Sequence, residues 1–150
     1  MVDLNPAIKL AGQIGCAVIP VASGLTIDHI TLPLLGVGEL GAAQYPITVL
    51  WFVALCNMIN FIDGMDGLAA GVAGIGLTTF AILAASLDRA VPAIIAASVA
   101  GAAIGFLAHN FHPAKIFMGD AGSMLLGFLI AGVAVSGVMK SAAALAIGLP

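Results

Sequence analysis

Two polar segments interrupt an otherwise apolar chain and hold most of its chemically reactive side chains. The first, residues 57–69, reads NMINFIDGMDGLA, and the second, residues 109–123, reads HNFHPAKIFMGDAGS. Together they contain three of the seven acidic residues, two of the three histidines and one of the four lysines and arginines. Ionisable groups are costly inside hydrophobic stretches, so their presence there indicates a functional site by default.

The first segment carries two acids, Asp63 and Asp66, three residues apart, so their carboxylates are neighbours if this turn is helical. Two close carboxylates cannot both ionise cheaply without a cation, and Mg²⁺ takes one or two protein carboxylates together with phosphate oxygens and waters. Gly64 and Gly67 weaken the helix here and could turn both acids inward. The alternative is structural, with Asp66 capping the next helix, because the helix dipole favours a carboxylate there.

The second segment predicts a helix end followed by a helix start. Pro113 ends the preceding helix, and the GDAGS run at 119–123 presents Asp120 and backbone N–H groups near the start of the next helix. A helix start suits phosphate, and Asp120 could hold a metal ion that bridges to it. His109 and His112 flank the break, where simple interfacial hydrogen bonding is the alternative to a substrate role.

The composition predicts a membrane protein. Of the 150 residues, 62% are hydrophobic and 7% are charged, and the mean hydropathy is +1.21. Soluble domains average roughly 25% charged residues. The net charge of −3 and the lack of a basic run argue against a nucleic-acid partner. Cys16 and Cys56 lie in apolar runs and are interpreted as packing residues without a disulfide.

Hydropathy predicts an all-α polytopic membrane protein with about five transmembrane helices. Each apolar segment is close to the minimum length for a span, about 17 residues. The predicted segments are 8–25, 46–63, 67–86, 92–109 and 122–139. Residues 26–45 alternate polar and apolar side chains and then break at glycines, which predicts an extended or hairpin-like excursion at the membrane surface. Its Asp28, His29 and Glu39 are interpreted as solvated residues.

Counting the crossings places both polar segments and Lys9 on one side of the membrane. The 26–45 excursion and the Asp88–Arg89 turn then lie on the other side. The lysines and arginines divide two against two and give no orientation. Two glycine pairs, at 67 and 71 and at 101 and 105, have the spacing that lets membrane helices approach closely, within one chain or between two. A homodimer is therefore possible.

The two polar segments resemble the motifs of one enzyme family. The first is similar to N-x-x-N-x-x-D-G-x-D-G-L and the second to N-x-x-P-A-x-x-F-M-G-D-x-G-S, which are motifs of the polyprenyl-phosphate N-acetylhexosamine-1-phosphate transferases (glycosyltransferase family 4). PAIKLAGQ at 6–13 resembles the segment after the family's aspartate-rich motif. The AKIF wording and the 26–45 excursion look more like the UDP-GlcNAc:undecaprenyl-phosphate GlcNAc-1-phosphate transferases than the related phospho-N-acetylmuramoyl-pentapeptide transferases.

The resemblance implies an integral membrane enzyme of about ten helices, with its site on the cytoplasmic face of the cell membrane. It implies that undecaprenyl phosphate attacks the β-phosphate of a UDP-N-acetylhexosamine, most simply UDP-GlcNAc, and releases UMP in cell-envelope polysaccharide synthesis. It implies Mg²⁺, with Mn²⁺ as a substitute, held by Asp120. It implies four catalytic residues: Asn60, Asp63, Asp66 and Lys9. It implies six substrate-binding residues, with Phe117 stacking on uridine: Asn57, Asp66, Asn110, His112, Lys115 and Phe117.

The chain departs from the family pattern at both ends. The family's adjacent aspartate pair would precede Asp3, where Met1 and Val2 stand, and its late loop rich in His and Arg would follow Pro150. We therefore expect residues 1–150 to form a partial transferase domain that is inactive alone, and UMP release by the purified chain would contradict this. The alternatives are an ion-coupled transporter, which solute uptake without UMP release would favour, and a non-catalytic membrane remnant.

Overall fold

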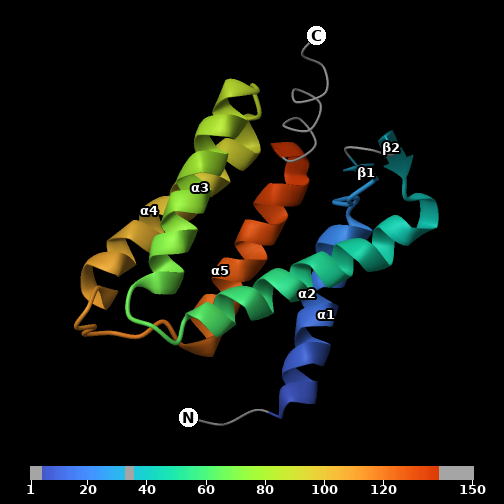
Figure 1. Ribbon diagram of the computed structural model, residues 1–150. Helices are drawn as coiled ribbons and strands as arrows, with labels where there is room; N and C mark the ends of the chain where they lie inside the picture. Colours follow the sequence, from blue (N-terminus) through green and yellow to red (C-terminus); the bar gives the residue numbers. More distant parts are fainter. Residues whose placement is uncertain (1–4, 33–35, 139–150) are drawn as a thin grey trace. The chain divides into compact units, whose positions relative to one another are not determined.

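The computed structural model describes residues 5–32 and 36–138 and shows an all-helical chain with one small hairpin (Figure 1). The elements in chain order are α1 (Pro6–Ala22), β1 (His29–Leu32), β2 (Gly36–Glu39), the 3₁₀ turn η1 (Gly41–Ala43), α2 (Gln44–Ile62), α3 (Leu68–Ser86), α4 (Ala90–Asn110), α5 (Gly119–Val133) and the π-helical turn η2 (Ala134–Val138). This confirms the predicted all-α membrane fold and its five helical segments, with ends that differ by a few residues.

Among the described residues, four helical stretches are long and apolar enough to cross a membrane, judged by length and composition: Gly41–Ile62, Leu68–Ser86, Ala90–Asn110 and Gly119–Ser136. The fifth, α1, is also apolar but has only 17 residues. Many large apolar side chains on these helices are exposed, as expected of surfaces that face lipid or other apolar helices.

The chain divides into two compact units, residues 1–54 and 55–150, and each is described by itself. In the first unit, β1 pairs antiparallel with β2, with His29 opposite Glu39. The backbone N–H of Ile27 donates to Oγ1 of the buried Thr48 at 2.9 Å, which ties the segment before the hairpin to the first turns of α2. The predicted hairpin within 26–45 is therefore confirmed.

Two of the three residues interpreted as solvated in this excursion can be examined. Asp28 and Glu39 are exposed, and Asp28 accepts a hydrogen bond from Oγ1 of Thr26 at 2.8 Å. The side chain of His29 lies outside the described residues, as do residues 1–4 and 139–150 at the two ends.

In the second unit, α3 and α4 form an antiparallel pair joined by a short turn at 87–89, and α5 packs against both (Figure 1). The core of this unit is built largely from small side chains. Its most buried members on α3 and α4 are Ala69, Ala73, Leu77, Ala84, Ala96, Ala100 and Ala103. Small residues at such positions let membrane helices approach closely, because lipid supplies no hydrophobic drive for their association.

α5 comes close to the backbone of α2 at Gly127. A Cβ added there would lie 2.5 Å from the carbonyl oxygen of Leu55 and 2.7 Å from Cα of Cys56, both on α2. Cys56 is buried, which fits its interpretation as a packing residue, whereas Cys16, on α1 in the first unit, is exposed and does not fit it. The second unit therefore packs the last turns of α2 directly on the backbone of α5.

The predicted glycine pairs do not mediate these approaches. Among the described residues, a Cβ added at Gly71, Gly101 or Gly105 would meet no atom within 4 Å. Gly67 makes a close approach, but as the residue before α3 rather than as part of a helix face. The spacing was correct for membrane helices, yet only the tertiary structure shows which small residues face a neighbour.

Candidate active site

The first polar segment becomes a tight turn at the end of α2. The helix ends at Ile62, residues 63–67 form the turn, and Gly67 precedes α3 with a φ of +73°. Such a φ favours glycine because it lacks a Cβ. Since Gly67 is the N-cap of α3 and no side chain caps this helix, the alternative that Asp66 caps it is wrong.

One polar cluster joins the end of α2 to the first turn of α5. Nδ2 of Asn60 donates to Oγ of Ser123 at 2.8 Å and lies 3.2 Å from Oδ1 of Asp120. Ser123 is fully buried, and its hydroxyl donates to the carbonyl of Gly119 at 3.0 Å. Asn60 is thereby fixed beside the Asp120 carboxylate.

Ser123 was not assigned a role from the sequence. The signal was present, because a serine four residues after a helix start can bond back to the carbonyl four positions earlier. Its second contact, with Asn60, depends on a residue 63 positions away in the chain. That contact could not be inferred from local spacing.

Asp63 faces the same cluster from the turn. Burial and the negative charge of Asp120 raise the pKa of Asp63 above its ordinary value, and a hydrogen bond from the backbone N–H of Gly119 opposes this. The acidic residue whose charge acts on Asp63 is therefore Asp120, rather than Asp66 as the spacing indicated. The pair of acids expected to need a cation is therefore Asp63 from the first polar segment and Asp120 from the second.

A second cluster ties the 63–67 turn to the loop between α4 and α5. Oδ2 of Asp66 accepts hydrogen bonds from the backbone N–H of Ala114 at 3.1 Å and from Nδ1 of His112 at 3.0 Å. These bonds, with the Ala114 N–H as the larger cause, hold the pKa of Asp66 below its ordinary value. The Asp66 carboxylate is therefore held in place within the 63–67 turn and is favoured in its charged form.

Asn110 also links the 63–67 turn to the loop between α4 and α5. Its side chain is buried; Oδ1 accepts from the N–H of Gly67 at 3.0 Å and Nδ2 donates to the carbonyl of Ile116 at 2.9 Å. A buried amide that bonds two backbone groups is costly to remove, because both partners lose their hydrogen bonds. The predicted contact of Asn110 with uridine stays a prediction.

We expect Asn110→Ala to lower the free energy of unfolding by about 2–3 kcal/mol, because the Gly67 N–H and the Ile116 carbonyl are left unsatisfied. His109→Ala is the matched control, since that exposed ring makes only a long contact of 3.4 Å with a carbonyl on its own helix. Thermal unfolding in detergent measures both. Equal stability of the two variants would contradict the role given to Asn110.

The other predicted site residues divide between the two units. In the second unit, Phe117 and Lys115 are exposed on the loop before α5, and Asn57 is exposed on α2 one turn before Asn60. Lys9 lies on α1 in the first unit. The structure thus brings together Asn60, Asp63 and Asp120 in one cluster and Asp66, Asn110 and His112 in the other. The roles of all these residues stay predictions.

The Asn60–Asp63–Asp120 cluster fits a hard divalent cation better than a soft one. Mg²⁺ prefers oxygen ligands and usually needs only one or two protein carboxylates. Mutual repulsion between Asp63 and Asp120 is the condition that a bound cation relieves. Within 5–32 and 36–138, no three His, Cys, Asp or Glu side chains gather as a complete metal cage, so substrate oxygens and waters would have to supply the remaining ligands.

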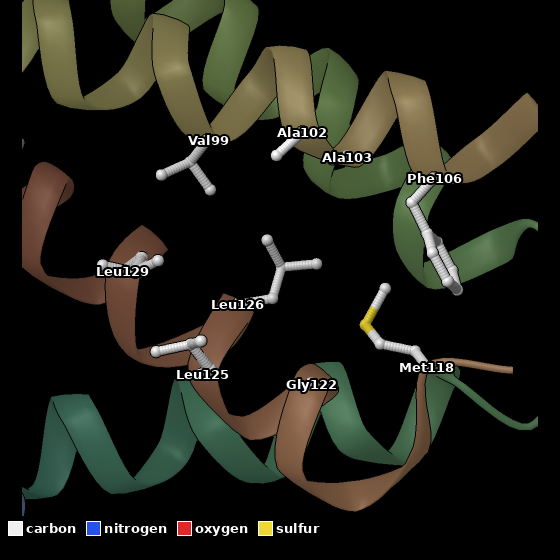
Figure 2. Close-up of a pocket in the computed structure, with 9 residues that line it drawn as sticks. All are labelled: Val99, Ala102, Ala103, Phe106, Met118, Gly122, Leu125, Leu126 and Leu129. Carbon is white, nitrogen blue, oxygen red and sulfur yellow. The ribbon is translucent and has the colours of Figure 1, made fainter.

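A separate pocket between α4 and α5 is apolar. Figure 2 shows its lining, and its volume is about 200 Å³. The lining residues are Val99, Ala102, Ala103, Phe106, Met118, Gly122, Leu125, Leu126 and Leu129. Sites for polar ligands include a few placed polar groups to orient them, and this lining has no polar side chain. The polar clusters, rather than this pocket, therefore form the candidate active site.

Comparison with known proteins gives the same family over nearly the whole chain. The family model described as glycosyl transferase family 4 matches residues 1–138. A Bacillus subtilis protein named "probable undecaprenyl-phosphate N-acetylglucosaminyl 1-phosphate transferase" is 44% identical over 149 residues, which are 99% of this chain and 42% of the relative. A Mycobacterium leprae decaprenyl-phosphate N-acetylglucosaminephosphotransferase is 42% identical over 139 residues, 85% of this chain and 35% of the relative.

A relative of lower identity carries the name of a different transferase. A phospho-N-acetylmuramoyl-pentapeptide-transferase of Halalkalibacterium halodurans is 39% identical over 132 residues, 85% of this chain and 40% of the relative. The chain thus spans less than half the length of each of these curated relatives.

Proposed function

Because the chain belongs to glycosyl transferase family 4, we propose that it carries part of the active site of a membrane phosphoglycosyl transferase. The enzyme transfers an N-acetylhexosamine-1-phosphate, first of all GlcNAc-1-phosphate, from a UDP-sugar to undecaprenyl phosphate. The names of the Bacillus and Mycobacterium relatives support a polyprenyl-phosphate acceptor and an N-acetylglucosaminyl phosphate donor group. The product serves cell-envelope polysaccharide synthesis.

The observation that carries the proposal is the meeting of the two polar segments in the second unit. Asn60 bonds Ser123 and Asp120 across about sixty residues of chain, and Asp63 interacts with Asp120 and Gly119. Phosphoryl transfer requires positioning and charge neutralisation more than covalent chemistry by the protein. A compact acidic cluster at the start of a helix supports that chemistry.

In the proposed reaction, an oxygen of undecaprenyl phosphate forms a bond to the β-phosphorus of the UDP-sugar. The bond between that phosphorus and the oxygen bridging to the α-phosphate breaks, and UMP leaves with the electron pair. Asp120 and Asp63 would hold Mg²⁺ or Mn²⁺, which supplies neutralisation of the diphosphate charge. Asn60, fixed by Ser123, keeps the Asp120 carboxylate in place.

The second cluster would bind the nucleotide. Asp66 is held rigidly by the loop before α5, and the ring of Phe117 is 75% exposed on the same loop, so it is accessible for stacking on uracil. Lys115 would supply positive charge near the phosphates, and the family resemblance gives Lys9 a role of the same kind. Asn57 and Asn110 complete the residues proposed to contact the substrate, and His112 belongs to the substrate-binding set through its hydrogen bond to Asp66.

The protein is a membrane protein, and we place its active site on the cytoplasmic face of the cell membrane, where UDP-sugars are available. The open faces at Gly71, Gly101 and Gly105 leave room for further helices or for a second copy of the chain. Family membership favours the transferase over the ion-coupled transporter.

The test of the proposed function is UMP release by the encoded full-length protein in detergent. We expect release that requires undecaprenyl phosphate, a UDP-N-acetylhexosamine and Mg²⁺, with UDP-GlcNAc as the first donor to be tried. Omitting each component in turn is the control. Absence of UMP release with every UDP-N-acetylhexosamine would contradict the proposal.

A further inference from the structure

The imidazole of His112 forms a hydrogen bond with one oxygen of the Asp66 carboxylate, which belongs to the other polar segment. His112 lies on the loop after α4, whereas Asp66 lies in the turn after α2, 46 residues earlier. The side chain of His112 is 82% exposed and that of Asp66 is 29% exposed. Both groups are therefore open to solvent, and the imidazole is more exposed than the carboxylate that it contacts.

The two hydrogen bonds to Asp66 go to the same carboxylate oxygen. Both the His112 ring and the Ala114 N–H donate to Oδ2. Within the described part of the chain, the structure gives Oδ1 of Asp66 no hydrogen bond. Two donors on one oxygen fix the rotation of the carboxylate, and the second oxygen is left to accept a hydrogen bond from a ligand.

We propose that His112 is a positioning residue, which orients the Asp66 carboxylate so that Oδ1 receives an N–H or O–H group of the nucleotide. This inference rests on the proposed function, in which Asp66 contacts the uridine of the UDP-sugar. The donor is Nδ1–H, which is present in the imidazolium and in one neutral tautomer of histidine. Positioning therefore requires no change of protonation during the reaction.

Three variants of the encoded full-length protein separate positioning from bulk packing. Asparagine carries an N–H donor about as far from Cα as Nδ1 of histidine, whereas the amide of glutamine lies one bond further out. We expect His112→Ala to raise the KM for UDP-GlcNAc about tenfold, because a hydrogen bond to a charged group is lost at an exposed position. His112→Gln should resemble it, and His112→Asn should stay within about threefold of the wild type.

The kinetic signature is a change in KM with kcat nearly unchanged, because the nucleotide is bound equally in the ground state and the transition state. The Kd for UMP, measured by calorimetry, should rise in parallel with KM. His109→Ala should leave both constants unchanged, since its exposed ring contacts only a carbonyl of its own helix. Each variant is first compared with the wild type in thermal unfolding, so that a folding defect is recognised.

An unchanged KM in His112→Ala would overturn the positioning role, and so would a defect in His112→Asn as large as in His112→Ala. Failure of the proposed function looks different. In that case the wild type neither releases UMP nor binds uridine nucleotides, which overturns both proposals, whereas the variant pattern overturns only the role of His112.

Discussion

Asp120→Asn is expected to reduce kcat for UMP release by at least about a hundredfold, the largest effect on activity that the structure predicts. The substitution keeps the size and hydrogen-bonding reach of the side chain but removes the charge that would hold the cation. Asn60 can still contact the amide oxygen at position 120, so the helix start should stay intact. The measurement is UMP release by the full-length protein over a range of Mg²⁺ concentrations.

Asp88→Asn is the matched control for this experiment. This substitution also replaces a carboxylate by an amide, but in the turn before α4. That turn is about 30 Å from the candidate site along a helix of 21 residues. The φ of 55° at Asp88 suits asparagine as well as aspartate. Equal activity of the two variants would remove Asp120 from the proposed metal site while leaving the reaction itself in place.

Gly127→Ala is expected to lower the free energy of unfolding by about 3 kcal/mol, the largest effect expected for a methyl group added at any described glycine. The new Cβ would lie 2.5 Å from the Leu55 carbonyl oxygen and 2.7 Å from Cα of Cys56. These are backbone atoms of α2, so no side chain can rotate away to make room. α2 and α5 would have to separate, which also disturbs the contact between Asn60 and Asp120.

Gly71→Ala is the control, because an added Cβ on that face of α3 meets no described atom within 4 Å. Alanine is the better helix former, so this variant should be as stable as the wild type or more stable by up to about 1 kcal/mol. Thermal unfolding in one detergent compares the two. If Gly127→Ala unfolds at the temperature of Gly71→Ala, the close contact between α2 and α5 is wrong.

The sequence by itself determined the class of fold and the family. Long apolar segments with few charges must form membrane helices, because backbone polar groups need partners inside a bilayer. Their ends are set by local chemistry, such as the turn at 63–67 and the break at Pro113, so they were predicted to within a few residues. The residues of the two motifs indicated the transferase family, and the family match to residues 1–138 confirms it.

Only the tertiary structure decided which side chains act together. Spacing paired Asp63 with Asp66, but Asp63 interacts with Asp120, and Asp66 with His112 and Ala114. The reason is physical: the turn after α2 departs from helical geometry, and each carboxylate follows the hydrogen-bond donors that the packed α4–α5 loop and α5 present. Sequence periodicity describes neighbours on one element, whereas these contacts depend on how α2, α4 and α5 meet.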